Sequence, residues 1–218
     1  MTVSVIVPWQ PGCPHRQAAW DFLRPRWAEV GEVVVGTCEG PWVKADAIAD
    51  GLTRATGDLL VVADADVWVD PTEALAACVT WAVPHLNVHR LSAESTALVL
   101  AGADWYDLPL DSSNGQDRRP YRGQIGGGVT VIRRDVYEQC PIPRIEGWGQ
   151  EDQSWSAALR CLFGEPWRGS GDLVHLWHPP QPRKNRLIGS DAGRALWRRY
   201  RDAARDPAAM RALIEETR

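Results

Sequence analysis

Residues 59–70 read LLVVADADVWVD, a run of apolar residues that leads directly into two carboxylates, Asp64 and Asp66. Such a run is typical of a strand that is buried on both faces, as the strands of parallel sheets are. Carboxylates this close raise each other's pKa unless a cation or hydrogen-bond donors lie between them. The stretch therefore predicts a buried strand that ends at a ligand. The alternative is a pair of aspartates in an ordinary turn.

The segments before this strand predict an α/β fold. Two β-branched runs cover residues 3–9 and 32–36, and a helical stretch over residues 16–30, interrupted by Pro25, separates them. A helix over residues 42–56 then leads into the strand at residues 58–63. This order predicts a parallel sheet with helices on both faces. Ligands of such sheets bind beyond the carboxyl ends of the strands, where Asp64 and Asp66 fall.

The rest of the chain continues the alternation of helices and strands. Asp70 and Pro71 are typical of a helix start, and residues 103–122 predict a long polar loop or lid. We expect strands at residues 129–133 and 172–177, helices that begin near residues 135 and 150, and two helical pieces over residues 190–218. The whole chain is expected to form one domain, because 218 residues suit a single α/β core.

Composition excludes several classes of protein. The formal net charge of −4 does not favour duplex nucleic acid as a partner. The first residues lack the features of a signal peptide, and no apolar run reaches the roughly 20 residues of a membrane span. We therefore expect a soluble, cytoplasmic protein without a membrane anchor. The five cysteines show no CxxC spacing, which predicts free thiols.

Two further groups of residues carry candidate chemistry. The stretch GWGQED, residues 147–152, places Glu151 and Asp152 at the start of a helix, behind a turn whose glycines favour close approach by a ligand. His175 and His178 lie at the end of the last predicted strand, and their spacing predicts that they point to opposite faces. We expect one of them to be a ligand and the other to be structural. Only one of Asp64 and Asp66 is expected to bind a cation directly, while the other holds a ribose or a water.

Five segments, taken together and in their order along the chain, resemble a glycosyltransferase of the GT-A fold, family 2 type. Within that fold they are similar to the β-1,4-galactosyltransferase and polypeptide N-acetylgalactosaminyltransferase group. The segments are VSVIVPW (3–9), KADAIADGLTRATGDLLVVADADVWVDP (44–71), GGGVTVIRRDVYEQC (126–140), GWGQEDQSW (147–155) and VHLWHP (174–179).

The resemblance implies a role for each matching residue. It implies an Mn²⁺ or Mg²⁺ ion on Asp66 and on His175, with His178 as the second choice. Asp152 would be the general base, with Glu151 and Trp148 holding donor and acceptor, and a base so placed implies inversion. The nucleotide-sugar donor, expected to be a UDP-sugar, would lie against Pro8, Trp9, Arg16, Lys44, Asp64, Gly127 and Gly128.

The resemblance also implies an α/β fold with a Rossmann-like nucleotide-binding half and a mixed, mostly parallel central sheet, and it implies a division of the chain. Residues 1–102 would be the nucleotide-sugar-binding half, residues 103–189 the acceptor and metal half, and residues 190–218 the C-terminal helices. The expected activity is hexosyl or N-acetylhexosaminyl transfer in a bacterial or phage enzyme.

Two other functions stay open, as does the acceptor. The same fold could serve as a catalytically weak module that binds nucleotide sugars or carbohydrates. A nucleotidyltransferase is the other alternative, but the residues 7–16, VPWQPGCPHR, lack its glycine-rich phosphate loop. A glycan, a protein, a small molecule and a hydroxymethylated DNA base are all candidate acceptors. The basic segment 197–211 could favour DNA, although an amphipathic helix packed on the domain is the preferred interpretation.

Overall fold

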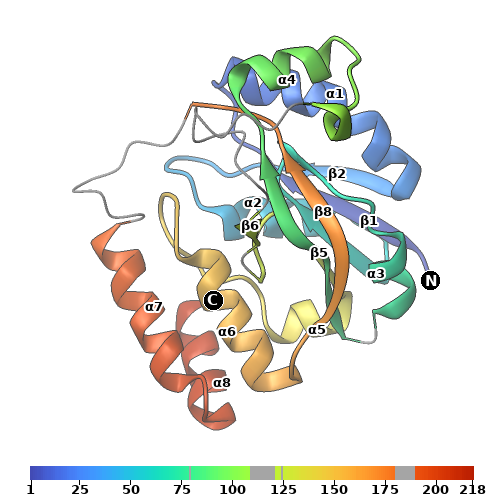
Figure 1. Cartoon of the computed structure of the whole chain (residues 1–218). Coiled ribbons are helices and arrows are strands. Elements are labelled where there is room, and N and C mark those ends of the chain that lie inside the picture. The colour runs from blue at the N-terminus through green and yellow to red at the C-terminus, as the bar shows by residue number, and fades with distance from the viewer. Residues whose placement is uncertain (79, 109–120, 124, 180–189) are drawn as a thin grey trace.

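The computed structural model describes residues 1–78, 80–108, 121–123, 125–179 and 190–218. In these ranges the chain folds around one mixed sheet of eight strands (Figure 1). Along the sheet the strands are β2 (Glu32–Gly36), β1 (Val3–Pro8), β3 (Leu59–Ala63), β7 (Val129–Arg133), β5 (Trp81–Arg90), β8 (Trp167–His175) and β4 (Val67–Trp68), and β6 (Tyr121–Arg122) pairs with β5.

The sheet combines parallel and antiparallel pairs. Strand β1 is parallel to both of its neighbours, β2 and β3, and β5 is parallel to β8. Strand β7 joins these two parallel groups, since it runs antiparallel to both β3 and β5. As a result, β1, β3, β5 and β8 all end at one edge of the sheet, and β7 begins there.

Helices cover both faces of the sheet (Figure 1). One hydrophobic core lies between the sheet and the helices α1 (Pro14–Val30), α3 (Thr72–Ala77) and α4 (Ala93–Leu100). The second core lies under the helices α2 (Lys44–Leu52), α5 (Arg134–Gln139), α6 (Glu151–Phe163), α7 (Asp191–Ala203) and α8 (Pro207–Thr217). A short 3₁₀ turn covers Trp105–Asp107.

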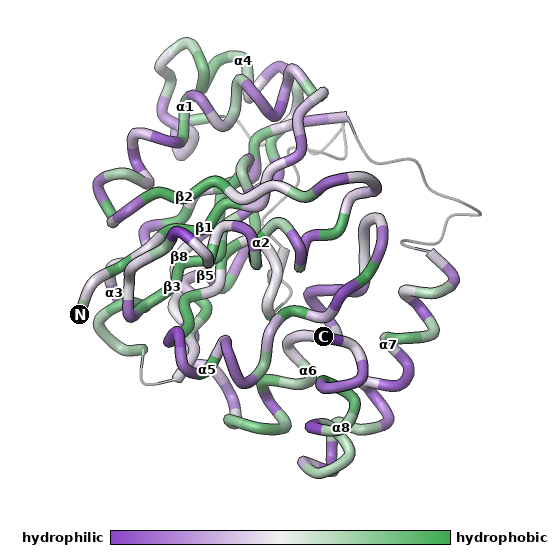
Figure 2. Tube along the Cα trace, turned by 180° about the vertical axis from the view of Figure 1, so that it is seen from behind, coloured by the Kyte–Doolittle hydropathy of each residue, from purple (hydrophilic) through white to green (hydrophobic). Residues whose placement is uncertain are grey.

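The alternation of side chains along the strands divides the two cores. In β1, Val5 and Val7 pack into the first core and Ile6 packs into the second, and all three are fully buried. Figure 2 shows hydrophobic residues gathered along the central strands, whereas hydrophilic residues are frequent along α7. Burial on both faces explains why these strands read as nearly continuous apolar runs.

Two predicted helices differ in extent from the observed ones. Helix α1 continues through Pro25 instead of being interrupted there. Pro25 is exposed, so water can satisfy the backbone carbonyl that lacks a partner where proline has no N–H. Helix α2 covers only Lys44–Leu52, which is shorter than the predicted 42–56.

The C-terminal helices pack on the domain. Tyr200 of α7 and Met210, Leu213 and Ile214 of α8 are buried in the second core. Arg199 pairs with Glu216 across the two helices. The basic segment 197–211 thus packs on the domain as expected, but it covers the end of α7 and the start of α8 and not a single helix.

Three other expectations can be compared with the structure. The predicted loop at residues 103–122 lies largely outside the described residues, since residues 109–120 are not among them. All five cysteines are free. In the described residues, no helix combines the length and the apolar character that a membrane crossing needs.

Candidate active site

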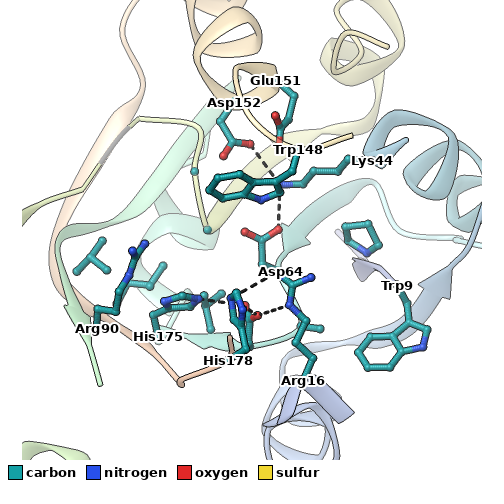
Figure 3. A pocket seen from close by; sticks show the side chains of 18 of the residues that line it. Trp9, Arg16, Lys44, Asp64, Arg90, Trp148, Glu151, Asp152, His175 and His178 are labelled. Carbon is teal, nitrogen blue, oxygen red and sulfur yellow. Dashed lines mark hydrogen bonds and ion pairs between the residues drawn. The ribbon is translucent and has the colours of Figure 1, made fainter. Parts of the chain in front are cut away.

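A cavity of about 290 Å³ lies at the edge of the sheet where β1, β3, β5 and β8 end (Figure 3). Its volume is close to the lower end, roughly 300 Å³, of the usual range for small-molecule sites. Every residue that the sequence assigned to the site lines this cavity: Pro8, Trp9, Arg16, Lys44, Asp64, Asp66, Gly127, Gly128, Trp148, Glu151, Asp152, His175 and His178. The fold thus brings together residues that lie far apart in the sequence, and the role of each stays a prediction.

The first charged group in the cavity surrounds Asp66. This carboxylate is buried, with a side chain only 5% exposed. Arg16 Nε lies 3.0 Å from Asp66 Oδ2, His178 Nε2 lies 3.3 Å from the same oxygen, and His175 Nε2 lies 3.5 Å from Oδ1. Burial alone would raise the pKa of Asp66, but these basic groups outweigh it and hold the pKa well below its usual range. Asp66 is therefore ionised at neutral pH.

Both histidines face Asp66, so the prediction that they point to opposite faces is wrong. Strand β8 ends at His175, and the chain beyond it no longer follows the pleat. The backbone N–H of Leu176 donates to the carbonyl of Asp66 at 2.9 Å, and that of Trp177 donates to Thr96 Oγ1 at 2.8 Å. These bonds turn the chain so that His178 returns to the same carboxylate as His175.

Asp66, His175 and His178 form a group that could hold a metal ion. One donor atom from each lies within 4.8 Å of the others. His178 Nδ1 is 2.8 Å from the carbonyl of Pro179, which can only accept, so Nδ1 carries the proton. Burial and the nearby positive charge of Arg16 lower the pKa of His178 despite Asp66, which favours the neutral ring. Its Nε2 lone pair therefore faces Asp66, as metal ligation requires.

The second charged group is centred on Lys44, the first residue of α2. Lys44 is buried, and its Nζ lies 2.9 Å from Asp64 Oδ1 and 3.2 Å from Asp152 Oδ1. Burial would lower the pKa of Lys44, but Asp152, Asp64 and Glu151 raise it well above its ordinary value. Lys44 therefore remains a cation, and it separates the roles of the two neighbouring aspartates. Asp64 pairs with Lys44, whereas Asp66 pairs with Arg16 and the histidines.

Asp152 lies at the start of α6, with its side chain 27% exposed. Loss of hydration, followed by repulsion from Glu151 and Asp64, raises the pKa of Asp152 to about 7, against the opposing effect of Lys44. A carboxylate with a pKa near neutrality is a stronger base than an ordinary aspartate. Glu151, 5% exposed, has a buried Oε2 without a hydrogen-bond partner among the described residues.

The turn before α6 has an unusual backbone. Gly147 and Gly149 have φ values of 86° and 104°, and Gln150 has φ 79°, the left-handed conformation that favours glycine. Gly126 also has a positive φ of 87°, and a Cβ added there would lie 2.9 Å from the backbone oxygen of Asp152. The glycine segment before β7 therefore supports the start of α6 directly.

Sequence reasoning missed part of the cavity lining. His85 and Arg90 of β5 line it, as do Trp42 and Trp177. Strand β5 was not predicted, because Pro84 and polar residues interrupt its apolar pattern. The segment also contains Trp81, Val83 and Val88, residue types that are frequent in strands, and these were the signal that could have revealed β5.

Comparisons with known proteins identify the fold. No family model and no curated protein matches the chain. Among solved structures, a mutant of Drosophila β-1,4-galactosyltransferase 7 in complex with manganese, UDP-Gal and xylobiose has a TM-score of 0.50. It is 13% identical, and the match covers 85% of this chain and 77% of that one. Glucosyl-3-phosphoglycerate synthase from Mycobacterium tuberculosis, in complex with Mg²⁺ and UDP, also has a TM-score of 0.50. It is 14% identical, with 98% and 79% covered.

These likenesses, together with the mixed sheet and its flanking helices, show that the chain has a GT-A fold. At this level of identity they show the fold alone.

Proposed function

We propose that the protein is a metal-dependent, inverting glycosyltransferase that moves a sugar from a UDP-sugar to an acceptor hydroxyl. The observation that carries the proposal is one cavity with two different charged groups. One is the possible metal site of Asp66, His175 and His178, and the other places Asp152 beside Lys44. Of the two GT-A neighbours, one is in complex with manganese and UDP-Gal and the other with Mg²⁺ and UDP, which supports this choice of donor and metal.

The donor set supports manganese more strongly than magnesium. Asp66 would provide one carboxylate oxygen, and His175 and His178 would provide imidazole nitrogens. Magnesium prefers oxygen ligands and water, whereas manganese also accepts imidazole. Such an ion supplies positive charge to the diphosphate as it departs from the sugar.

The other cavity residues would hold the donor. Pro8, Trp9 and Arg16 lie at the end of β1 and the start of α1, where they would contact the nucleotide. Asp64 would bind the ribose, and Lys44 fixes that carboxylate with an ion pair. Gly127 and Gly128 would leave room for the donor sugar beside β7.

Asp152 would act as the general base. The acceptor oxygen attacks the anomeric carbon and forms the new glycosidic bond, while the bond from that carbon to the diphosphate oxygen breaks and its electron pair leaves with the diphosphate. The hydroxyl proton passes to the Asp152 carboxylate. Because attack and departure occur on opposite faces of the sugar, a single displacement inverts the anomeric centre.

The negative charge around Lys44 would assist this step. Three carboxylates surround one ammonium group, so the group carries excess negative charge when all of them are ionised. Glycosyl transition states carry positive charge on the sugar ring, which an excess of negative charge stabilises. Glu151 would contribute here together with Asp152.

The acceptor is proposed only as a hydroxyl-bearing molecule. Trp148 is 42% exposed and lies on the cavity, so its flat face is available for stacking on a sugar ring. The net charge of −4 and the packing of α7 and α8 on the domain do not favour DNA as the acceptor. Hexosyl or N-acetylhexosaminyl transfer is the expected reaction class.

The test is UDP release from a panel of UDP-sugars, with and without Mn²⁺. We expect slow, manganese-dependent hydrolysis of one donor even without an acceptor, and loss of this activity in Asp66→Asn and Asp152→Asn. Manganese-dependent donor binding with no UDP release, even when a panel of acceptors is added, would instead identify a binding module. Absence of both donor binding and release would contradict the proposal.

A further inference from the structure

Arg16 contacts the group of residues that could hold the metal. Its Nε lies 3.0 Å from Asp66 Oδ2, and its Nη2 lies 3.3 Å from His178 Nε2. Figure 3 shows the Arg16 side chain entering the cavity with its guanidinium group beside His178. The same guanidinium thus contacts two of the three residues that could ligate a cation.

Because the proton of His178 is on Nδ1, the contact between Arg16 and His178 Nε2 excludes a metal ion from Nε2. Because Nδ1 donates to the carbonyl of Pro179, Nε2 of the neutral ring offers a single lone pair. Arginine can only donate, so that lone pair accepts a hydrogen from Nη2. The lone pair cannot bind a metal ion and accept this hydrogen at the same time.

The spacing of the two acceptors also requires a cation. His178 Nε2 and Asp66 Oδ2 lie only 3.3 Å apart, and both present electron pairs to the cavity. Two such atoms repel each other unless a positive group bridges them. The guanidinium provides that bridge with a bond to each atom, which stabilises the buried Asp66 carboxylate when no metal is bound.

We propose that Arg16 is a built-in counter-cation that competes with the metal for Asp66 and His178, so that the metal binds only after Arg16 has been released. This inference rests on the proposed function, since the released guanidinium would find a new partner in the diphosphate of the donor. Nucleotide and metal then favour each other's binding, because the nucleotide removes the competitor of the metal.

The first test measures Mn²⁺ affinity by electron paramagnetic resonance of the free ion, in the absence of nucleotide. Hydrogen bonds between charged groups suggest that Arg16→Ala and Arg16→Gln bind Mn²⁺ about tenfold more tightly than the wild type. Arg16→Lys keeps the charge but has a shorter side chain and lacks the rigid planar fork of arginine, so its affinity should lie between those of the wild type and Arg16→Ala. Arg24→Ala, an exposed position on the same helix, is the matched control and leaves the affinity unchanged.

The second test repeats the titration with saturating UDP. In the wild type UDP tightens Mn²⁺ binding by a larger factor than in Arg16→Ala, and the ratio of the two factors measures the contribution of Arg16. A third, independent readout is the NMR signal of the Arg16 Nε–H, which shifts as diamagnetic Mg²⁺ is added to the wild type.

The outcomes separate this inference from the proposed function. Mn²⁺ binding that requires Asp66 but is no tighter in Arg16→Ala and Arg16→Gln overturns the inference and leaves the function standing. An Arg16 signal that does not move at saturating Mg²⁺ does the same. Absence of Asp66-dependent Mn²⁺ binding in the wild type, both without UDP and with saturating UDP, overturns both.

Discussion

Lys44 Nζ lies 3.2 Å from Asp152 Oδ1, although 108 residues separate the two in the sequence. The contact connects the N-terminus of α2 to the N-terminus of α6, on the same face of the sheet. Lys44 also bonds Asp64 at 2.9 Å, so one buried ammonium group orients carboxylates from two distant segments. The position of the proposed base is therefore set by a lysine that the sequence alone assigned to the nucleotide.

Replacement of the proposed base should separate chemistry from binding. In Asp152→Asn we expect kcat for sugar transfer to fall by about 10²–10⁴, the usual contribution of general-base catalysis. The Kd for UDP with Mn²⁺ should stay nearly unchanged, because the nucleotide residues are intact. Steady-state kinetics and calorimetry check the two quantities. Asp202→Asn, on the exposed side of α7, is the control, and equal losses of transfer and UDP binding would rule out Asp152 as the base.

The pH dependence of transfer should report the raised pKa of Asp152. Transfer needs the ionised carboxylate, so kcat/KM should rise with pH and level off above about 7, far above the range of an ordinary aspartate. In Lys44→Met the pKa rises further, because the charge that opposes the shift is lost. The rising limb of the profile then moves to higher pH. A limb that stays in place in this variant would show that another group controls the profile.

Asp152 should also make stability depend on pH. Its pKa is higher in the folded chain, about 7, than the value of about 3.9 in the unfolded chain. The folded state therefore holds the proton more tightly, so this contribution to stability is complete below about pH 4 and is lost as pH rises through about 7. The side chain of Asp152→Asn does not titrate, so the variant does not lose this stability as the pH rises. Denaturant titrations without divalent cations should show the variant gaining stability over the wild type between these pH values, and a constant difference would contradict the assignment.

The two aspartates of the DAD stretch should differ in their effect on the metal. Asp66→Asn should weaken Mn²⁺ binding by at least about 100-fold, because it removes the only carboxylate of the proposed ligand group. Asp64→Asn is the matched comparison, two residues away, and should cause a much smaller loss since Asp64 pairs with Lys44 instead. Free-ion titration measures both. Equal losses would mean that the cation lies between the two aspartates.

Gly126 should be needed for catalysis as well as for stability. Gly126→Ala introduces a Cβ 2.9 Å from the backbone oxygen of Asp152, in a left-handed conformation. Gly164, at the other end of α6, has φ 80° and open space around it, so Gly164→Ala tests the backbone strain alone. Gly164→Ala should lose roughly 1–2 kcal/mol of unfolding free energy through strain, and Gly126→Ala should lose more because its Cβ also meets the Asp152 carbonyl. Only Gly126→Ala should also slow transfer, and unimpaired transfer in it would show that this contact does not position Asp152.

Much of the fold could be predicted from local sequence. The β-branched runs gave β1, β2, β3 and β7 nearly to the residue, because strands buried on both faces need continuous apolar sequence. Strand β5 was not predicted, because its sequence is not a continuous apolar run. It contains Pro84, and its register against β8 shifts around His85, so its pattern follows no simple alternation. The predicted interruption of the first helix at Pro25 was also wrong, because an exposed helix position tolerates proline better than a buried one.

The residues that line the cavity could be predicted as a set, but the pairings of their charges could not. Motif order indicated which side chains meet at the edge of the sheet, because the ends of parallel strands gather there. The partners of each charge depend on the reach of long side chains across that edge. Arg16 and Lys44 were both assigned to the nucleotide, yet one contacts Asp66 and the other contacts Asp64 and Asp152. The turn after β8, which brings His178 back to Asp66, likewise depends on tertiary hydrogen bonds.

The proposed metal ligands come from segments that are synthesised at very different times. Asp66 follows β3 early in the chain, whereas His175 and His178 lie at the end of β8, more than a hundred residues later. A growing polypeptide on the ribosome therefore cannot complete this ligand set until β8 has emerged and paired beside β5. Ion capture would then mark the moment at which the nascent protein has finished assembling its sheet.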